Sequence, residues 1–140
     1  ILRPPLIYGD GDRSFGYGPT GFLRKALDGE NIRMWGSGTE LREFIYIDDI
    51  VGIIKKLIYS DFNGVLNVVR GKSYTYADIT SIIRDDLCLD LEISFRKRTK
   101  EKVDHIFSSD RIENVIPDFS FTNLESGIKL MYQSMHIKNK

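Results

Sequence analysis

The sequence has 140 residues, and its 20 Lys and Arg side chains balance 20 Asp and Glu side chains, so the formal net charge is zero. This length suits one ordinary domain that buries a core without disulfides or bound metal. The neutral charge excludes a general attraction to nucleic acid or to an anionic membrane, so a charged partner must be bound by a local cluster.

The cysteine content and the hydropathy argue against a disulfide-stabilised, a zinc-binding and a membrane-spanning protein. The single cysteine, Cys88, cannot form an intrachain disulfide and has no partner at zinc-site spacing, so we expect no metal and a small, buried, apolar role for this residue. Lys55 and Lys56 break the longest apolar run, which excludes a membrane span. We expect a cytoplasmic protein, and because the sequence opens at Ile1 inside a strand-like segment, we expect a longer polypeptide.

Strand-like and helical segments alternate along the first half. Residues 1–8 are apolar, and two prolines within them exclude a helix, so they predict a strand that leads into a glycine-rich loop. Helical spacing over residues 22–27, which stops at Gly29, predicts a short helix. Residues 32–35 and 44–47 are strand-like and flank a Gly-Ser-Gly turn, so they predict a hairpin.

The second half continues the alternation. Asp48 predicts the start of an amphipathic helix, residues 65–69 predict a strand, and Thr75 caps a helix that runs to residue 87. Residues 91–95 predict another strand, and the capping-box spacing of Thr122 and Glu125 predicts the final helix. The alternation predicts a single α/β lobe.

Signatures of catalysis are missing from the sequence. The glycines between residues 9 and 21 do not have dinucleotide-binding spacing, and there is no Gly-x-Ser-x-Gly elbow. His105 and His136 lack partners for nucleophilic catalysis, and the pair Asp48 and Asp49 is best explained by helix capping and solvation. We therefore expect no catalytic residue in this chain.

Two residues near the Gly-Ser-Gly turn suit a nucleotide. Trp35 ends one strand-like segment and Arg42 begins the next, so an indole face and a forked cation flank one turn. This pair suits a nucleoside diphosphate, with the base stacked on the indole and the phosphates bound by the guanidinium. The alternative is a surface arginine that pairs with Glu40 or Glu43.

Residues 96–102 form a basic run, RKRTKEK. Such a run is usually a solvated edge. A diphosphate site would need one of its side chains to turn inward, and Arg98 is the best candidate. RNA binding by the run is a weaker alternative, because the net charge is neutral and no aromatic residues are interleaved.

Four segments in order resemble one family. ILRPPLIYGDGD, PTGFLRKALDG, IRMWGSGTELREFIYIDDI and LNVV are similar to motifs from the C-terminal half of the NAD-dependent nucleotide-sugar epimerases and dehydratases, the extended short-chain dehydrogenases. The resemblance implies one domain over residues 1–140, a small mixed-sheet substrate-binding lobe with packed helices. Residues 1–9 would be the last strand region of a Rossmann-type sheet whose main part lies in an N-terminal lobe.

The family's N-terminal lobe holds NAD or NADP and a catalytic Tyr-x-x-x-Lys pair, and no tyrosine here is followed four residues later by lysine. The resemblance implies partners: a nucleoside-diphosphate sugar, the chain's own N-terminal lobe, and a second copy in a homodimer. It also implies a role for six residues. Arg42 would clamp the diphosphate, Trp35 would stack on the base, and Arg98 would be a second phosphate-binding arginine. Gly21 and Phe22 would contact the nucleoside, and Pro4 would lie near the nicotinamide. Leu6 departs from the family, because many members have Asn there to bind the sugar nucleotide.

The expected function is therefore substrate binding in a UDP-glucose 4-epimerase-like epimerase or dehydratase, inactive as this chain alone. Two alternatives stay open. One is an epimerase/reductase similar to GDP-fucose synthase, and the other is a non-catalytic sugar-nucleotide-binding module.

Overall fold

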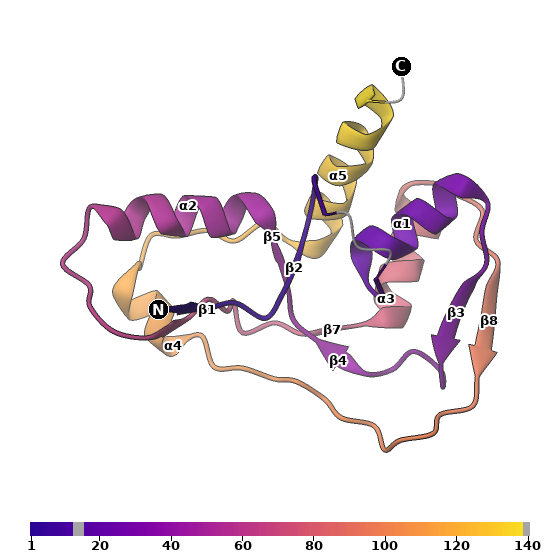
Figure 1. The fold of residues 1–140 in the computed structure, drawn as a ribbon, viewed down its shortest axis with the longest axis horizontal. Coiled ribbons are helices and arrows are strands. Elements are labelled where there is room, and N and C mark those ends of the chain that lie inside the picture. Colours follow the sequence, from indigo (N-terminus) through magenta and orange to yellow (C-terminus); the bar gives the residue numbers. More distant parts are fainter. Residues whose placement is uncertain (13–15, 139–140) are drawn as a thin grey trace.

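A computed structural model describes residues 1–12 and 16–138, in which strands and helices alternate (Figure 1). The predicted α/β class is confirmed. In chain order the elements are β1 (Leu2–Arg3), β2 (Leu6–Tyr8), α1 (Pro19–Asp28), β3 (Ile32–Trp35), β4 (Leu41–Arg42), β5 (Phe44–Tyr46), α2 (Ile47–Ile58), β6 (Leu66–Asn67), β7 (Tyr74–Thr75), α3 (Tyr76–Ser81), the π-helical turn η1 (Ile82–Asp86), β8 (Ile93–Arg96), α4 (Asp110–Val115) and α5 (Leu124–Lys138).

The strands pair in a mixed pattern. β1 pairs with β6, β2 with β5 and β3 with β8, all in parallel, whereas β4 and β7 are antiparallel. The predicted hairpin of β3 with β5 is therefore wrong. The segment after β3 instead runs through β4 toward the centre of the molecule, where β5 joins β2 (Figure 1). Ile32 and Met34 of β3 are buried, and this burial fixes which face of the strand turns inward.

Two apolar clusters form the interior. The larger one joins α1, α3 and α5 to β3, and the smaller one joins α2 and α4 to β5 and β6 (Figure 1). The fully buried members of the larger cluster include Leu23, Ile32, Ile79, Ile83, Ile128 and Met131, and those of the smaller one include Ile45, Ile53, Leu66 and Val68. The smaller cluster borders the parallel strands near the N-terminus.

Local signals at two helix ends act as predicted. The Asp78 backbone N–H donates to Thr75 Oγ1 at 3.0 Å, and the Thr75 N–H donates to Asp78 Oδ2 at 2.8 Å, which completes a capping box before α3. Gly29 ends α1 in the left-handed conformation, with φ of 67°.

Two predicted caps are wrong. The helix α2 begins at Ile47, so Asp48 lies in its first turn and does not cap it. At α5 the cap is Asn123, whose Oδ1 accepts the Ser126 N–H at 2.7 Å. Thr122 instead donates its N–H and hydroxyl to Asp49, at 2.9 and 2.8 Å. Asp49 is thus buried and joins α2 to the start of α5, whereas the sequence predicted a solvated group.

Cys88 and α4 also differ from expectation. Cys88 is exposed and has a left-handed backbone with φ of 53°, because it lies in the turn after η1. The helix α4 was not predicted from the sequence. None of the helices in the described part of the chain has the length and apolar character to cross a bilayer. Over residues 1–12 and 16–138, His, Cys, Asp and Glu side chains form no group of three that could hold a metal ion.

Glu43 is an acidic residue inside the fold. Its side chain is buried, and Oε1 accepts the backbone N–H of Arg70. Oε2 is buried and has no hydrogen-bond partner among the described residues. Burial raises the pKa of this carboxyl above its ordinary value of 4.5, against the opposing effect of the backbone donors Arg70 and Gly71.

This raised pKa predicts how a Glu43→Gln variant behaves. The folded state binds the Glu43 proton more tightly than the unfolded state, so this group's contribution to stability falls as the pH rises from 4.5 through the folded-state pKa. The free energy of unfolding of the variant, relative to wild type, should therefore increase with pH over that window. Urea unfolding at a series of pH values measures this difference, and a difference independent of pH would contradict the assignment.

Candidate functional site

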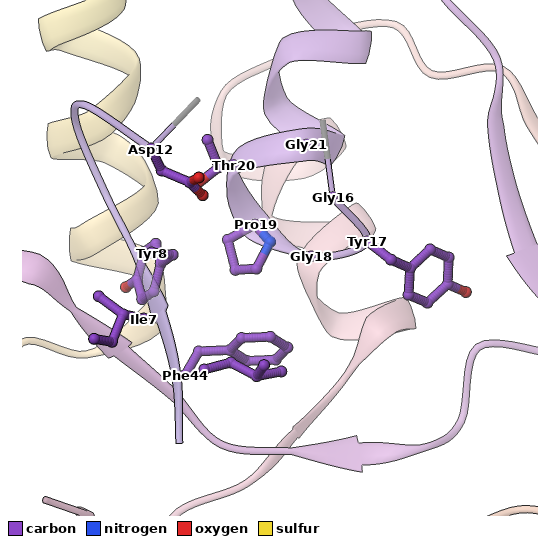
Figure 2. A pocket seen from close by; sticks show the side chains of 11 residues that line it. Ile7, Tyr8, Asp12, Gly16, Tyr17, Gly18, Pro19, Thr20, Gly21 and Phe44 are labelled. Atoms are coloured by element: carbon purple, nitrogen blue, oxygen red, sulfur yellow. The ribbon is translucent and has the colours of Figure 1, made fainter. Parts of the chain in front are cut away.

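A cavity of about 270 Å³ opens between β2, the loop before α1, and β5 (Figure 2). Ile7 and Tyr8 of β2 lie on one side of it, and Phe44 and Pro19 lie near them. The other lining residues are Leu6, Asp12, Gly16, Tyr17, Gly18, Thr20 and Gly21. Gly21, one of the two residues predicted to contact the nucleoside, therefore lines the cavity.

Gly21 allows the first turn of α1 to lie against the preceding loop. A Cβ atom at this position would lie 1.8 Å from the carbonyl oxygen of Gly16, which is backbone and cannot rotate away. Pro19 suits the first turn of α1, where a missing N–H costs nothing. The close approach of Gly16 to Gly21 thus forms one wall of the cavity.

Tyr17 connects this cavity to the end of β3. Its hydroxyl accepts the Trp35 backbone N–H at 3.0 Å. Its ring lies 4.3 Å from the Tyr76 ring and 5.0 Å from the Phe22 ring, centroid to centroid. Burial raises the pKa of Tyr17, and the negative charge of Glu40 raises it further. The Tyr17 ring points away from Pro19 and Phe44 (Figure 2).

Arg42 is half-buried, and its guanidinium is hydrogen-bonded to the protein backbone. Its Nη1 donates to the carbonyl oxygens of Leu41 at 2.8 Å and Val103 at 2.5 Å. Burial raises the pKa of Tyr76, and the nearby positive charge of Arg42 acts in the opposite direction. Among the described residues Arg42 forms no salt bridge, so the alternative of pairing with Glu40 or Glu43 is wrong.

Arg98 turns inward, as predicted for a member of the basic run. Its Nη2 forms a salt bridge with Oε1 of Glu40. The guanidinium also covers the glycine turn after β3, since a Cβ at Gly36 would lie 3.2 Å from Arg98 Nε. Trp35 is 39% exposed, and the guanidinium carbon of Arg96 lies 5.6 Å from its ring centroid. One face of the indole is therefore partly covered by Arg96.

The three residues predicted to bind base and phosphates are linked to one another through intervening side chains. Tyr17 binds the backbone of Trp35 and packs on Tyr76, and the positive charge of Arg42 acts on Tyr76. Arg98 lies on the turn that directly follows Trp35. We call this set the arginine–tyrosine cluster; its members are Tyr17, Trp35, Glu40, Arg42, Tyr76 and Arg98.

The remaining predicted residues lie elsewhere. Phe22 is fully inside the larger apolar cluster, where its ring supports Tyr17. Pro4 lies between β1 and β2 and does not line the cavity.

Sequence reasoning missed three members of the cluster. Tyr17 carried a usable signal, because an aromatic residue among glycines in GYGPTG suggests a ligand-facing loop. Tyr76 had no such signal, since it reads only as the first residue of a capped helix. Glu40 was considered as a partner of Arg42, whereas its partner is Arg98, from a distant strand end.

Several side chains of the basic run, residues 96–102, contact other residues of the protein. Arg96 lies over Trp35, Arg98 pairs with Glu40, and Lys102 Nζ binds Asp104 Oδ2 at 2.8 Å. Three of the five basic side chains of the run thus contact other residues of the fold.

One protein-family model matches part of the sequence. Residues 1–68 match the model of the "NAD dependent epimerase/dehydratase family". The chain is similar to that family over this part. The matched segment contains Trp35, Arg42 and Gly21, and Arg98 lies beyond it.

Two curated sugar-nucleotide enzymes are also similar to part of this chain. A dTDP-4-dehydro-6-deoxy-D-allose reductase from Streptomyces bikiniensis is 29% identical over 89 residues, which are 59% of this chain and 26% of the reductase. UDP-glucuronic acid decarboxylase 6 from Arabidopsis thaliana is 26% identical over 80 residues, 57% of this chain and 23% of the decarboxylase. The aligned parts thus span about a quarter of these proteins.

Solved structures share the fold. MoeE5 in complex with UDP-glucose and NAD superposes with a TM-score of 0.85 at 21% identity, over 99% of this chain and 47% of MoeE5. A UDP-glucose 4-epimerase from Thermotoga maritima with UDP-glucose gives a TM-score of 0.83 at 21% identity, over 100% of this chain and 46% of the epimerase. This chain therefore has the same fold as just under half of each of these two enzymes.

Proposed function

We propose that this chain binds the nucleoside-diphosphate sugar in an NAD(P)-dependent epimerase or dehydratase of the UDP-glucose 4-epimerase type. The observation that supports the proposal is the chain of contacts through Tyr17 and Tyr76 that links Trp35 to Arg42, with Arg98 over the turn that follows Trp35. Two guanidinium forks suit the paired phosphates, and the indole suits a flat base. Gly21 and the cavity beside Tyr17 supply the adjoining space for the rest of the ligand.

The electrostatics of the cluster favour an anion. Arg42 donates to carbonyl oxygens and forms no salt bridge among the described residues, so its positive charge is offset only in part, by the nearby carboxylate of Asp104. Arg98 is 26% exposed at its side chain and can turn toward a ligand. A base would stack on the indole face that Arg96 leaves open. These groups position a substrate and neutralise its charge, and none of them is suited to act as the general base.

The cofactor does not fit this chain by itself. A dinucleotide needs a glycine-rich turn between a strand and a helix N-terminus. The described strands and helices offer no such unit, because β2 leads into a long loop in place of a tight turn. We therefore propose that NAD or NADP is held mainly by an N-terminal lobe, with Pro4 at most near the nicotinamide.

An apolar surface near the N-terminus suits that lobe as a partner. β1 and β2 each have a single described strand partner, although parallel strands normally lie in sheets covered on both faces. Leu6 and Ile7 are 43% and 42% exposed on β2. The solved relatives are about twice as long as the part this chain matches. We propose that the additional lobe pairs with these strands and covers this surface.

The exposed side of α2 extends the same surface. Val51, Ile54 and Ile58 recur at helical spacing and are all exposed. Ile54 and Ile58 also border a cavity of about 290 Å³ together with Ile1 and Leu2 of the β1 segment. This continuity with β1 is what supports one covering partner for both.

The single tryptophan allows a direct test of the proposal. Titration of the chain with UDP should quench Trp35 emission to saturation, since the base would stack on the indole. GDP in place of UDP tests the alternative similar to GDP-fucose synthase, and uridine tests the need for the phosphates. If neither UDP nor GDP changes the emission, and calorimetry finds no binding, the proposed function is wrong.

A further inference from the structure

Glu40 has one paired and one unpaired carboxylate oxygen. The residue is 6% exposed, and Oε1 pairs with the Arg98 guanidinium. Oε2 is buried and has no hydrogen-bond partner in the described part of the chain. A buried carboxylate with an unpaired oxygen is costly, so its position here calls for a reason.

The position of Glu40 places a negative charge among the groups proposed to bind phosphates. Its charge reaches both phenols of the arginine–tyrosine cluster, since it raises the pKa of Tyr17 and of Tyr76. Glu40 thus offsets one of the two guanidinium charges of the cluster. Arg98 cannot give its full charge to a ligand while this salt bridge lasts.

We propose that Glu40 sets the affinity of the site, because its carboxylate competes with the ligand's diphosphate for Arg98. This inference rests on the proposed function. A diphosphate that takes Arg98 leaves Glu40 inside the protein with neither oxygen paired, and that cost weakens binding. Glu40 therefore keeps the product from being held too tightly, at the expense of ground-state affinity.

The isosteric variant Glu40→Gln tests the competition. Glutamine keeps the shape and one acceptor for Arg98 but has no charge, so releasing Arg98 to a ligand costs less. The variant should bind UDP about tenfold more tightly than wild type, by the difference between charged and neutral hydrogen bonds. Pyrophosphate should gain similarly, and uridine, which has no phosphate, should not gain. Equal or weaker UDP binding by the variant would overturn the proposal.

Glu92→Gln is the matched control. Glu92 is exposed and lies just before β8. Its replacement by glutamine removes the same formal charge as Glu40→Gln, at a position that does not contact Arg98. Its UDP affinity should stay at the wild-type value. A tenfold gain in this control as well would assign the effect to overall charge and overturn the role of Glu40.

A ligand-free measurement separates this inference from the proposed function. Iodide is an anion and acrylamide is neutral, and both quench Trp35, which lies beside Arg98. Glu40→Gln should raise the iodide quenching constant relative to that of acrylamide, because Arg98 is released. The double variant Glu40→Gln/Arg98→Gln, which leaves no buried charge unpaired, should return the ratio to the wild-type value or below. If the double variant keeps the increase, Glu40 does not act through Arg98, whether or not UDP binds.

Discussion

Replacing Arg42 with alanine should weaken UDP binding on the order of 100-fold, because charge-assisted hydrogen bonds to a partly buried diphosphate contribute a few kcal/mol. Arg42 forms no salt bridge in the described structure, so most of its charge is available to the phosphates. Titration of Trp35 emission measures the loss. An Arg42→Ala variant with wild-type affinity would remove the central residue of the proposed site.

Controls separate this binding effect from a loss of structure. Arg42 also holds the Val103 carbonyl, so urea unfolding must show that the variant remains folded. Arg42→Lys keeps the charge without the fork and should recover only part of the affinity. Arg33→Ala removes an exposed arginine from β3 and should leave both the affinity and the stability near wild type.

A Gly21→Ala substitution should have the largest effect on stability of the single-methyl changes considered. The added Cβ would meet the Gly16 carbonyl at 1.8 Å, and a backbone atom cannot move without displacing the loop. Overpacking of this kind costs about 1–3 kcal/mol, and we expect the upper part of that range. Displacement of the loop should also close the cavity and weaken UDP binding.

Gly52→Ala is the matched control, because Gly52 is also a helical glycine. A Cβ there would lie 3.1 Å from the Phe119 ring, which can shift, and alanine favours the helix. Urea unfolding should therefore show little change for Gly52→Ala and a large loss for Gly21→Ala. Comparable losses in the two variants would show that the contact with Gly16 is not special.

The elements that were predicted well depend on short-range contacts. The Thr75 capping box joins residues three positions apart, and Gly29 ends α1 through its own backbone conformation. One of the two caps that were predicted wrongly, Thr122, makes a tertiary contact. Thr122 had the right spacing for a capping box, but Asp49 of α2 binds its hydroxyl, and Asn123 caps α5 instead.

The candidate site divides in the same way. Trp35 and Arg42 were recognised from their residue types beside one turn, but the hairpin expected to bring them together does not form, because β3 pairs with β8 and β4 pairs with β7. The inward position of Arg98 was predicted, but its partner Glu40 was not, because that contact requires the parallel pairing of β3 with β8. Tyr76 likewise lies near Arg42 because β7, which directly precedes it, pairs with β4 and places Tyr74 opposite Arg42.

Local patterns in the sequence were enough to predict the α/β class, most of the helices, and the residue types available for a nucleotide. These features depend on neighbours a few positions apart, whose geometry the backbone imposes locally. The tertiary structure decided which strands pair, that Asp49 and Glu43 are buried, and that Glu40 meets Arg98. Pairings such as Ile32 with Ile93 join distant segments, and they are chosen by which faces the whole fold can bury together.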